Sequence, residues 1–140
     1  MVEIIAGEKG KGKTKHLLDK VNNSVKNSSG NVIYIDKNSK HMYDLDSKIR
    51  LIDMCNYPVS STEEFLGFLS GILSQNNDIE EMFLDSFLTI AFIDTNDGLC
   101  NAIEKLDKIC EMFSVKFVLS VSKNEKDLPE CAKGKIVISL

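Results

Sequence analysis

The sequence predicts a single α/β domain, residues 1–140, in which a mainly parallel sheet lies between two layers of helices. Two patterns lead to this prediction. Short, continuous apolar runs of the kind that form buried strands alternate with longer stretches whose apolar residues recur at helical spacing. Strands that alternate with helices along a chain form parallel sheets, and helices cover both faces of such sheets.

The predicted strands are short apolar runs, mostly bounded by charged or turn-forming residues. They lie at residues 2–6, 32–35, 49–54, 82–84, 116–121 and 135–140. A further apolar run, 87–93, comes shortly after Asp85, and two interpretations of it stay open. It either adds to the core or forms an exposed apolar patch, which would mark a surface for a partner or for a second copy.

Three stretches are predicted to be helices. The first begins near Lys15 and has a leucine or valine at every fourth position. The second follows a capping box, in which Ser61 caps the helix and Glu64 stands three residues later. The third carries an apolar stripe over residues 99–113. The polar segment 37–48 is expected to be a loop or a broken helical turn.

A specific local motif lies between the first predicted strand and the first predicted helix. Residues 7–14 read Gly-Glu-Lys-Gly-Lys-Gly-Lys-Thr and match G-x-x-x-x-G-K-[ST], the phosphate-binding loop. The glycines let the backbone curl so that several N–H groups point at one anion, and the helix that follows adds the positive end of its dipole. The predicted phosphate-binding residues are Gly7, Glu8, Lys9, Gly10, Lys11, Gly12, Lys13 and Thr14.

The ligand that this loop predicts is ATP, or another nucleoside triphosphate, together with Mg²⁺. Lys13 is expected to reach the β- and γ-phosphates, and the Thr14 hydroxyl is expected to bind Mg²⁺. A carboxylate at the end of a buried strand is expected to hold the ion through water. Asp85 is the first choice for this carboxylate and Asp94 is the rival, because each follows an apolar run.

Charge and hydropathy limit the other classes of partner. The net charge is −4 and no cluster of arginines is present, so nucleic acid is not supported as a ligand. Basic residues gather only around the phosphate loop. No apolar run reaches the roughly 18 residues that a membrane-spanning helix needs. We therefore expect a cytoplasmic protein without a membrane segment.

The cysteines and histidines show no ligand spacing. The four cysteines are widely separated and form no C-x-x-C pair, and the two histidines have no partner at a metal-binding distance in sequence. We therefore expect reduced thiols rather than a metal site or a disulfide framework. The cysteines are Cys55, Cys100, Cys110 and Cys131.

The order of these elements resembles the core of RecA-like ATPases, a group of P-loop NTPases. The resemblance covers residues 1 to about 124 and rests on three features: the phosphate loop, the strand that ends Tyr34-Ile35-Asp36, and Met82-Phe83-Leu84-Asp85-Ser86. In that family the magnesium-side strand often ends in Asp-Ser. The resemblance implies a three-layer P-loop NTPase fold with a five-stranded sheet, in which strand 116–121 lies between the first strand and the magnesium-side strand. It also implies that Ser122 or Asn124 senses the γ-phosphate.

Two departures from the family concern catalysis. RecA-like hydrolases carry a glutamate just past the second strand to polarise the attacking water, and Asn38 stands at that place here. Asparagine can orient a water molecule but cannot take its proton, so Asp36 is the nearby carboxylate that could substitute. Arg50 is the only arginine of the chain. It is predicted within or near a strand and is therefore a poor candidate for an arginine finger.

We therefore expect a Mg-ATP-binding protein that hydrolyses ATP slowly or only in an assembly, such as a homo-oligomer. Lys13 would neutralise charge on the transferred phosphoryl group, and Asp36 or Asn38 would act on the water. The alternative is a non-catalytic module in which ATP orders segments 37–48 and 87–93 for a protein partner. A small-molecule kinase is a further alternative, which the lack of arginines and of an obvious lid insertion disfavours.

Overall fold

The computed structural model describes residues 1–140, and its six strands form one sheet. The strands are β1 Val2–Ala6, β2 Asn31–Asp36, β3 Arg50–Asp53, β4 Ile79–Leu84, β5 Lys116–Val121 and β6 Ile136–Ser139. Their order is β3-β2-β4-β5-β1-β6, and every neighbouring pair is parallel. The parallel α/β prediction is confirmed, as is the position of β5 between β1 and β4. The expected number of five strands was wrong, because β6, which follows the residues 1–124 that the resemblance covers, adds a sixth strand beside β1.

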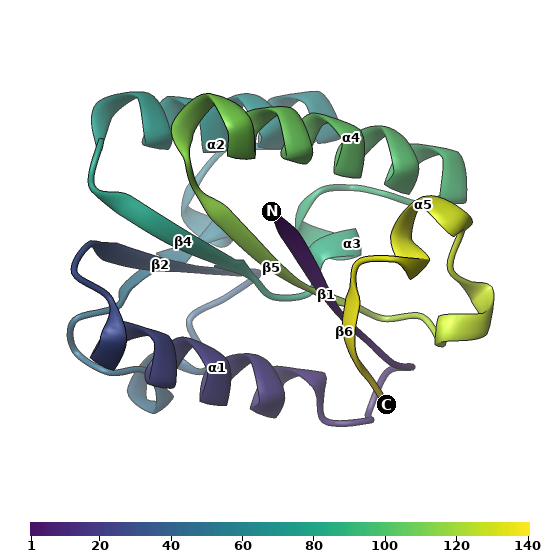
Figure 1. Cartoon of the computed structure of the whole chain (residues 1–140), viewed down its shortest axis with the longest axis horizontal. Coiled ribbons are helices and arrows are strands. Elements are labelled where there is room, and N and C mark those ends of the chain that lie inside the picture. The colour runs from purple at the N-terminus through teal and green to yellow at the C-terminus, as the bar shows by residue number, and fades with distance from the viewer.

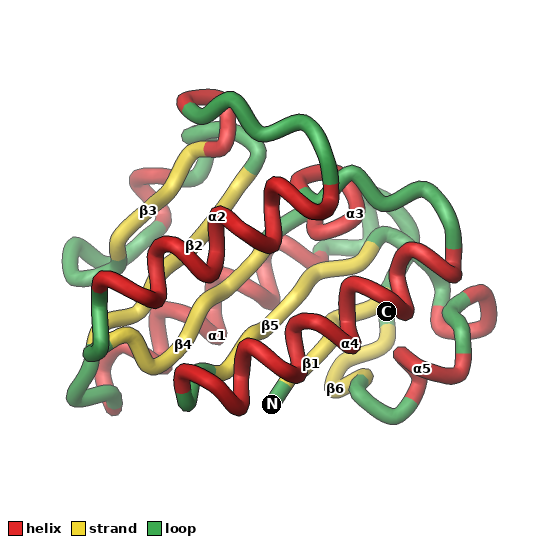
Figure 2. The backbone as a smooth tube through the Cα atoms, turned by 90° about the horizontal axis from the view of Figure 1, so that it is seen from above, coloured by secondary structure: helices red, strands yellow, loops and turns green.

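Helices cover both faces of the sheet. Helix α1, Lys13–Asn27, lies on one face, and α2, Thr62–Gln75, and α4, Asn96–Phe113, lie on the other (Figure 1). Figure 2 shows α2 and α4 side by side over the strands. Shorter elements lie in the connections: α3 Phe87–Ile90, α5 Glu130–Lys133, and the 3-10 turns Met42–Asp44, Met54–Asn56 and Glu125–Asp127. None of these helices is both long and apolar enough to cross a membrane.

The two faces of the sheet carry cores of different size. The core under α2 and α4 contains 28 buried residues, among them Leu69 of α2 and Leu106 of α4. The core under α1 contains nine, among them Leu17, Val21 and Val25, which are the residues that the fourfold spacing predicts. Burying a leucine or valine side chain contributes about 1.5–3 kcal/mol. Most of the apolar stabilisation therefore lies on the α2–α4 face.

The capping box at α2 forms with one change of partner. The Ser61 hydroxyl accepts a hydrogen bond from the Glu64 N–H at 3.1 Å, as predicted. The Glu64 carboxylate accepts from the N–H of Ser60, at 2.6 Å, rather than from that of Ser61. Segment 37–48 contains the 3-10 turn Met42–Asp44, in agreement with the prediction of a broken helical turn.

The apolar run 87–93 belongs mainly to the core. Phe87 and Ile90, both in α3, are buried, and so are Ala91 and Ile93. The chain turns sharply after β4, because Ser86 adopts a left-handed conformation with φ 55°, and this turn folds the run back against the sheet. Among the apolar side chains of the run, Phe92 is the exposed one, since it is 49% exposed, and its φ is 56°.

The prediction of reduced thiols was wrong for two of the four cysteines. Cys100 of α4 and Cys131 of α5 form a disulfide, with their Cα atoms 5.8 Å apart. The short helix α5 packs against α4 and brings the two residues together across 31 positions of sequence, which spacing alone does not reveal. Cys55 and Cys110 are free. The cytoplasmic expectation loses the support that it took from reduced cysteines, because disulfides persist mainly in oxidising compartments.

Replacing Cys100 with serine should lower the free energy of unfolding by about 3 kcal/mol, because the disulfide closes a long loop in the unfolded chain. Urea unfolding followed by circular dichroism measures this change. Reducing the wild-type protein should lower its stability to that of the variant, whereas Cys55→Ser, at an exposed free thiol, should leave it unchanged. A wild-type protein equally stable with and without reductant would contradict the prediction.

Candidate functional site

The glycine-rich loop between β1 and α1 has the backbone that its sequence predicts. Gly10 and Gly12 have φ values of 88° and 90°, in the left-handed region that favours glycine. Gly12 caps α1, and no side chain accepts the N–H groups of the first helical turn. Residues 8–12 are exposed. The loop therefore offers free backbone donors at the positive end of a helix, which is an arrangement suited to an anion.

Lys13 lies at the base of this loop. Its side chain is buried, and its Nζ donates a hydrogen bond to the carbonyl oxygen of Glu8 at 3.0 Å. Burial lowers the pKa of the ammonium group, and the negative charge of Asp85 partly opposes this shift. A cation held under the loop in this way adds positive charge beside the free N–H groups of the loop.

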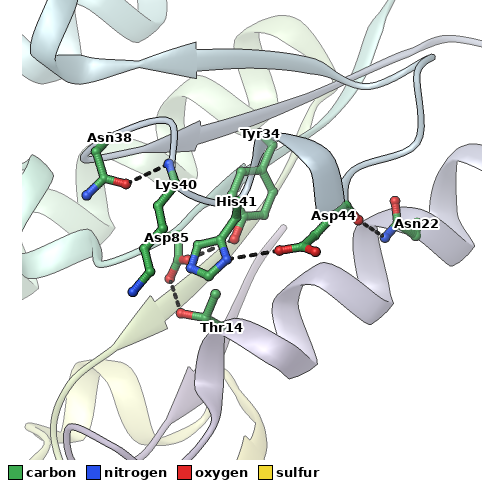
Figure 3. Close-up of polar contacts among 8 residues, drawn as sticks. All are labelled: Thr14, Asn22, Tyr34, Asn38, Lys40, His41, Asp44 and Asp85. Carbon is green, nitrogen blue, oxygen red and sulfur yellow. Dashed lines mark hydrogen bonds and ion pairs between the residues drawn. The ribbon is translucent and has the colours of Figure 1, made fainter.

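Asp85 lies at the carboxyl end of β4 and is only 2% exposed. Its Oδ1 accepts hydrogen bonds from the Thr14 hydroxyl at 3.3 Å, the Ser120 hydroxyl at 2.6 Å and the Ser86 N–H at 2.9 Å. Its Oδ2 accepts from the Tyr34 hydroxyl at 2.8 Å. Figure 3 shows the bonds from Thr14 and Tyr34. The carboxylate thus joins α1, β2 and β5 at one edge of the sheet.

The structure brings Asp85, and not Asp94, next to Thr14. Both residues follow apolar runs, but the run before Asp94 forms α3 and the turn after it instead of a strand. Asp94 is exposed in the connection that leads to α4. The carboxylate that follows β4 is therefore the one that lies beside the glycine-rich loop.

Asp36 ends β2, the strand beside β4, and is 2% exposed. Its Oδ1 accepts a hydrogen bond from the Lys37 N–H at 2.7 Å. Burial, followed by the negative charge of Asp85, raises the pKa of Asp36 to about 6. Asn38 is half-buried, and its Oδ1 accepts from the Lys40 N–H at 2.9 Å, which commits the amide oxygen to a local turn.

Three other predicted residues do not join this cluster. Ser122 is exposed beyond the end of β5. Asn124 accepts a hydrogen bond from the Lys126 N–H at 3.0 Å and so caps the 3-10 turn that follows. Arg50 begins β3 and is exposed at the amino edge of the sheet, whereas Asp85 lies at the carboxyl edge. Arg50 therefore cannot contact the same ligand within one chain.

Tyr34 and Ser120 are site residues that sequence reasoning did not single out. Each is a lone hydroxyl within an otherwise apolar strand. A buried hydroxyl needs a hydrogen-bond partner, and this rule could have predicted a polar group beside each strand. Burial and the negative charge of Asp85 raise the pKa of Tyr34, so its hydroxyl keeps its proton and donates a hydrogen bond to the carboxylate.

The buried polar side chains of the chain all lie at this carboxyl edge. They are Lys13, Asp36, Asp85 and Ser120. Burying a charge costs several kcal/mol, so a cluster of such groups is typical of a functional site. A comparison with models of known protein families finds no match, and a comparison with curated protein sequences finds none either. The function is therefore inferred from these side chains and their arrangement.

The raised pKa of Asp36 predicts a specific dependence of stability on pH. A carboxyl group whose folded pKa of about 6 exceeds its ordinary value of 3.8 stabilises the fold fully below about pH 4. This contribution, at most about 3 kcal/mol, is lost as the pH rises through 6. Relative to wild type, Asp36→Asn should therefore gain stability between pH 4 and pH 7. Urea unfolding at several pH values measures the difference.

A matched control is Asp94→Asn, because Asp94 is an exposed carboxylate. The difference between this variant and wild type should stay constant across the same pH range. Parallel curves for Asp36→Asn and wild type would contradict the raised pKa.

Proposed function

We propose that this protein binds a nucleoside triphosphate, such as ATP, with Mg²⁺ at the carboxyl edge of its sheet, in a P-loop NTPase fold of RecA-like type. The observation that carries the proposal is the 3.3 Å contact between the Thr14 hydroxyl and Asp85 Oδ1. Thr14 closes the glycine-rich loop, and Asp85 ends a strand separated from β1 by β5. This is the strand order and pairing that the resemblance to RecA-like ATPases implies.

The loop would bind the phosphates. The free N–H groups at the start of α1 suit an anion, and the buried ammonium of Lys13 adds positive charge. In this proposal the Lys13 side chain exchanges the Glu8 carbonyl oxygen for phosphate oxygens. Such an exchange keeps a hydrogen bond to the buried ammonium in both states, so neither state leaves the charge without a partner.

Thr14 and Asp85 supply the kind of donors that Mg²⁺ prefers, which are hydroxyl and carboxylate oxygens. The chain contains no group of three or more His, Cys, Asp or Glu residues that could form a complete protein cage for a metal. Mg²⁺ usually keeps several waters and binds one or two protein oxygens together with substrate phosphates, so this donor set fits it. When bound, the ion would neutralise charge on the phosphate oxygens.

The residues at the carboxyl edge of the sheet favour slow hydrolysis of ATP over fast hydrolysis. Lys13 would stabilise charge on the transferred phosphoryl group. Asp36, with a pKa of about 6, can accept a proton near neutral pH, but its side chain is almost completely buried. Asn38 already uses its amide oxygen in a turn. No arginine lies at this edge, so a neighbouring subunit would have to provide any arginine finger.

A nucleotide-gated interaction module is the second candidate, and Phe92 favours it. Its aromatic ring is half-exposed although its backbone is left-handed, a conformation that is rare for a bulky residue. It borders a small cleft that also includes Lys37, next to Asp36. Nucleotide bound at the sheet edge would then order segments 37–48 and 87–93, and a protein partner would bind the ordered segments.

Lys13→Ala should weaken Mg-ATP binding by about 10- to 100-fold, because charged hydrogen bonds to phosphate are lost. Isothermal titration calorimetry measures the affinity. Lys108→Ala removes an exposed lysine from the opposite layer and should leave the affinity unchanged. Equal affinity of wild type and Lys13→Ala, with both proteins folded, would refute the phosphate loop.

Phosphate release per chain should increase with protein concentration if a second copy completes the site. The rate from Mg-ATP is measured over a wide concentration range, with Lys13→Ala as the inactive control. A constant rate per chain would assign the complete reaction to one subunit. Bound ATP without any release would favour the interaction module instead.

A further inference from the structure

A cleft of about 440 Å³ lies between α1 and the segment that contains the 3-10 turn Met42–Asp44. Thr14 lines it, so the cleft borders the phosphate loop and the Asp85 cluster. Polar side chains dominate the remaining wall, which His41 and Asp44 form together with Lys15, Asp19 and Asn22 of α1. The cleft is much larger than one water molecule, which occupies roughly 30 Å³ of liquid volume. It therefore has room for a polar molecule beside the phosphates.

The segment that forms one wall of the cleft is anchored to α1. Asn22 donates from its Nδ2 to the carbonyl oxygen of Asp44 at 2.8 Å, and its Oδ1 accepts from the Asp46 N–H at 2.8 Å. One side chain of α1 thus binds the backbone on both sides of Leu45. This anchoring holds the turn in place although it contains no long helix or strand.

His41 and Asp44 form a pair within this anchored turn. Nδ1 of His41 lies 3.2 Å from Oδ2 of Asp44 (Figure 3). A carboxylate only accepts hydrogen bonds, so Nδ1 carries the proton. In the neutral ring Nε2 then keeps its lone pair, and the carboxylate stabilises the ring once Nε2 is protonated. The His41 side chain is 29% exposed, which leaves it accessible to a ligand in the cleft.

We infer that this cleft receives the O–H group that attacks the terminal phosphorus, and that His41, oriented by Asp44, is the general base for it. The inference rests on the proposed function. The attacking oxygen bonds to the γ-phosphorus, the bond from that phosphorus to the β,γ-bridging oxygen breaks, and the leaving nucleoside diphosphate keeps the electron pair. The proton of the O–H group passes to Nε2 of His41, and Asp44 stabilises the resulting cation.

The position of the pair explains why His41 suits this role better than the residues that sequence reasoning chose. Asp36 is almost completely buried, and the amide oxygen of Asn38 is already in use. His41 is accessible and shares one cleft with Thr14. The O–H group belongs either to water or to a small alcohol, because both present the same chemistry to Nε2.

The test compares four variants of the full chain with wild type. His41→Gln and His41→Ala remove the base, and Asp44→Asn keeps the shape of the carboxylate without its charge. Tyr43→Ser is the matched control, because Tyr43 is in the same turn and is 92% exposed. Each protein is given γ-labelled Mg-ATP with and without glycerol. Labelled inorganic phosphate reports attack by water, and labelled glycerol phosphate reports attack by an alcohol.

The kcat of whichever reaction wild type performs should fall about 100- to 1,000-fold in His41→Gln, while Tyr43→Ser keeps wild-type kcat. The kcat of Asp44→Asn should fall less, by about 10- to 100-fold. The Kd for Mg-ATP, measured in parallel, should change by less than about threefold in all variants, because the pair acts on the nucleophile. Added imidazole should restore part of the rate of His41→Ala, which a merely structural role would not allow.

Two results would overturn the inference and leave nucleotide binding intact: ATP bound normally with His41→Gln as fast as wild type, or ATP bound with no turnover to either acceptor. A wild-type protein that binds no ATP would instead refute the proposed function, and this inference with it.

Discussion

The buried carboxylate of Asp85 imposes the strongest constraint on this structure. A charge removed from water costs several kcal/mol unless hydrogen bonds replace its hydration. Asp85 receives four such bonds, from Thr14, Tyr34, Ser120 and the Ser86 N–H. These donors come from separate parts of the chain, so satisfying one carboxylate fixes how α1, β2, β4 and β5 meet. The fold brings the four donors to Asp85, and the packing of these elements in turn depends on their hydrogen bonds to this carboxylate.

The two cores differ in their contribution to stability and in their distance from the site. The larger core under α2 and α4 carries most of the apolar burial, while the smaller core under α1 ends at the polar edge where the site lies. Tyr34 belongs to both environments, because its ring is part of the smaller core and its hydroxyl binds Asp85. The α1 side can therefore hold buried charges without being the main source of stability.

Local patterns in the sequence predicted the features that depend on near neighbours. Glycine placement predicted the loop conformation, and apolar runs predicted the strands. The sequence favoured Asp85 over Asp94 but did not exclude Asp94, because the left-handed turn at Ser86, which leads into α3, has no glycine to signal it. The bonds from Tyr34 and Ser120 to Asp85 and the Cys100–Cys131 disulfide join residues 31 to 51 positions apart. Such pairings follow from the order of strands and helices in space, which no short motif contains.

The burial of Tyr34 also gives the protein an internal optical reporter. The chain has no tryptophan and three tyrosines. Tyr43 and Tyr57 are exposed, whereas Tyr34 is completely buried with its hydroxyl on the carboxylate of Asp85. Ultraviolet difference spectra should therefore separate one shielded phenol from two that are exposed to solvent. A change in the environment of Asp85 would alter the absorption of that single shielded ring, without any dye attached to the protein.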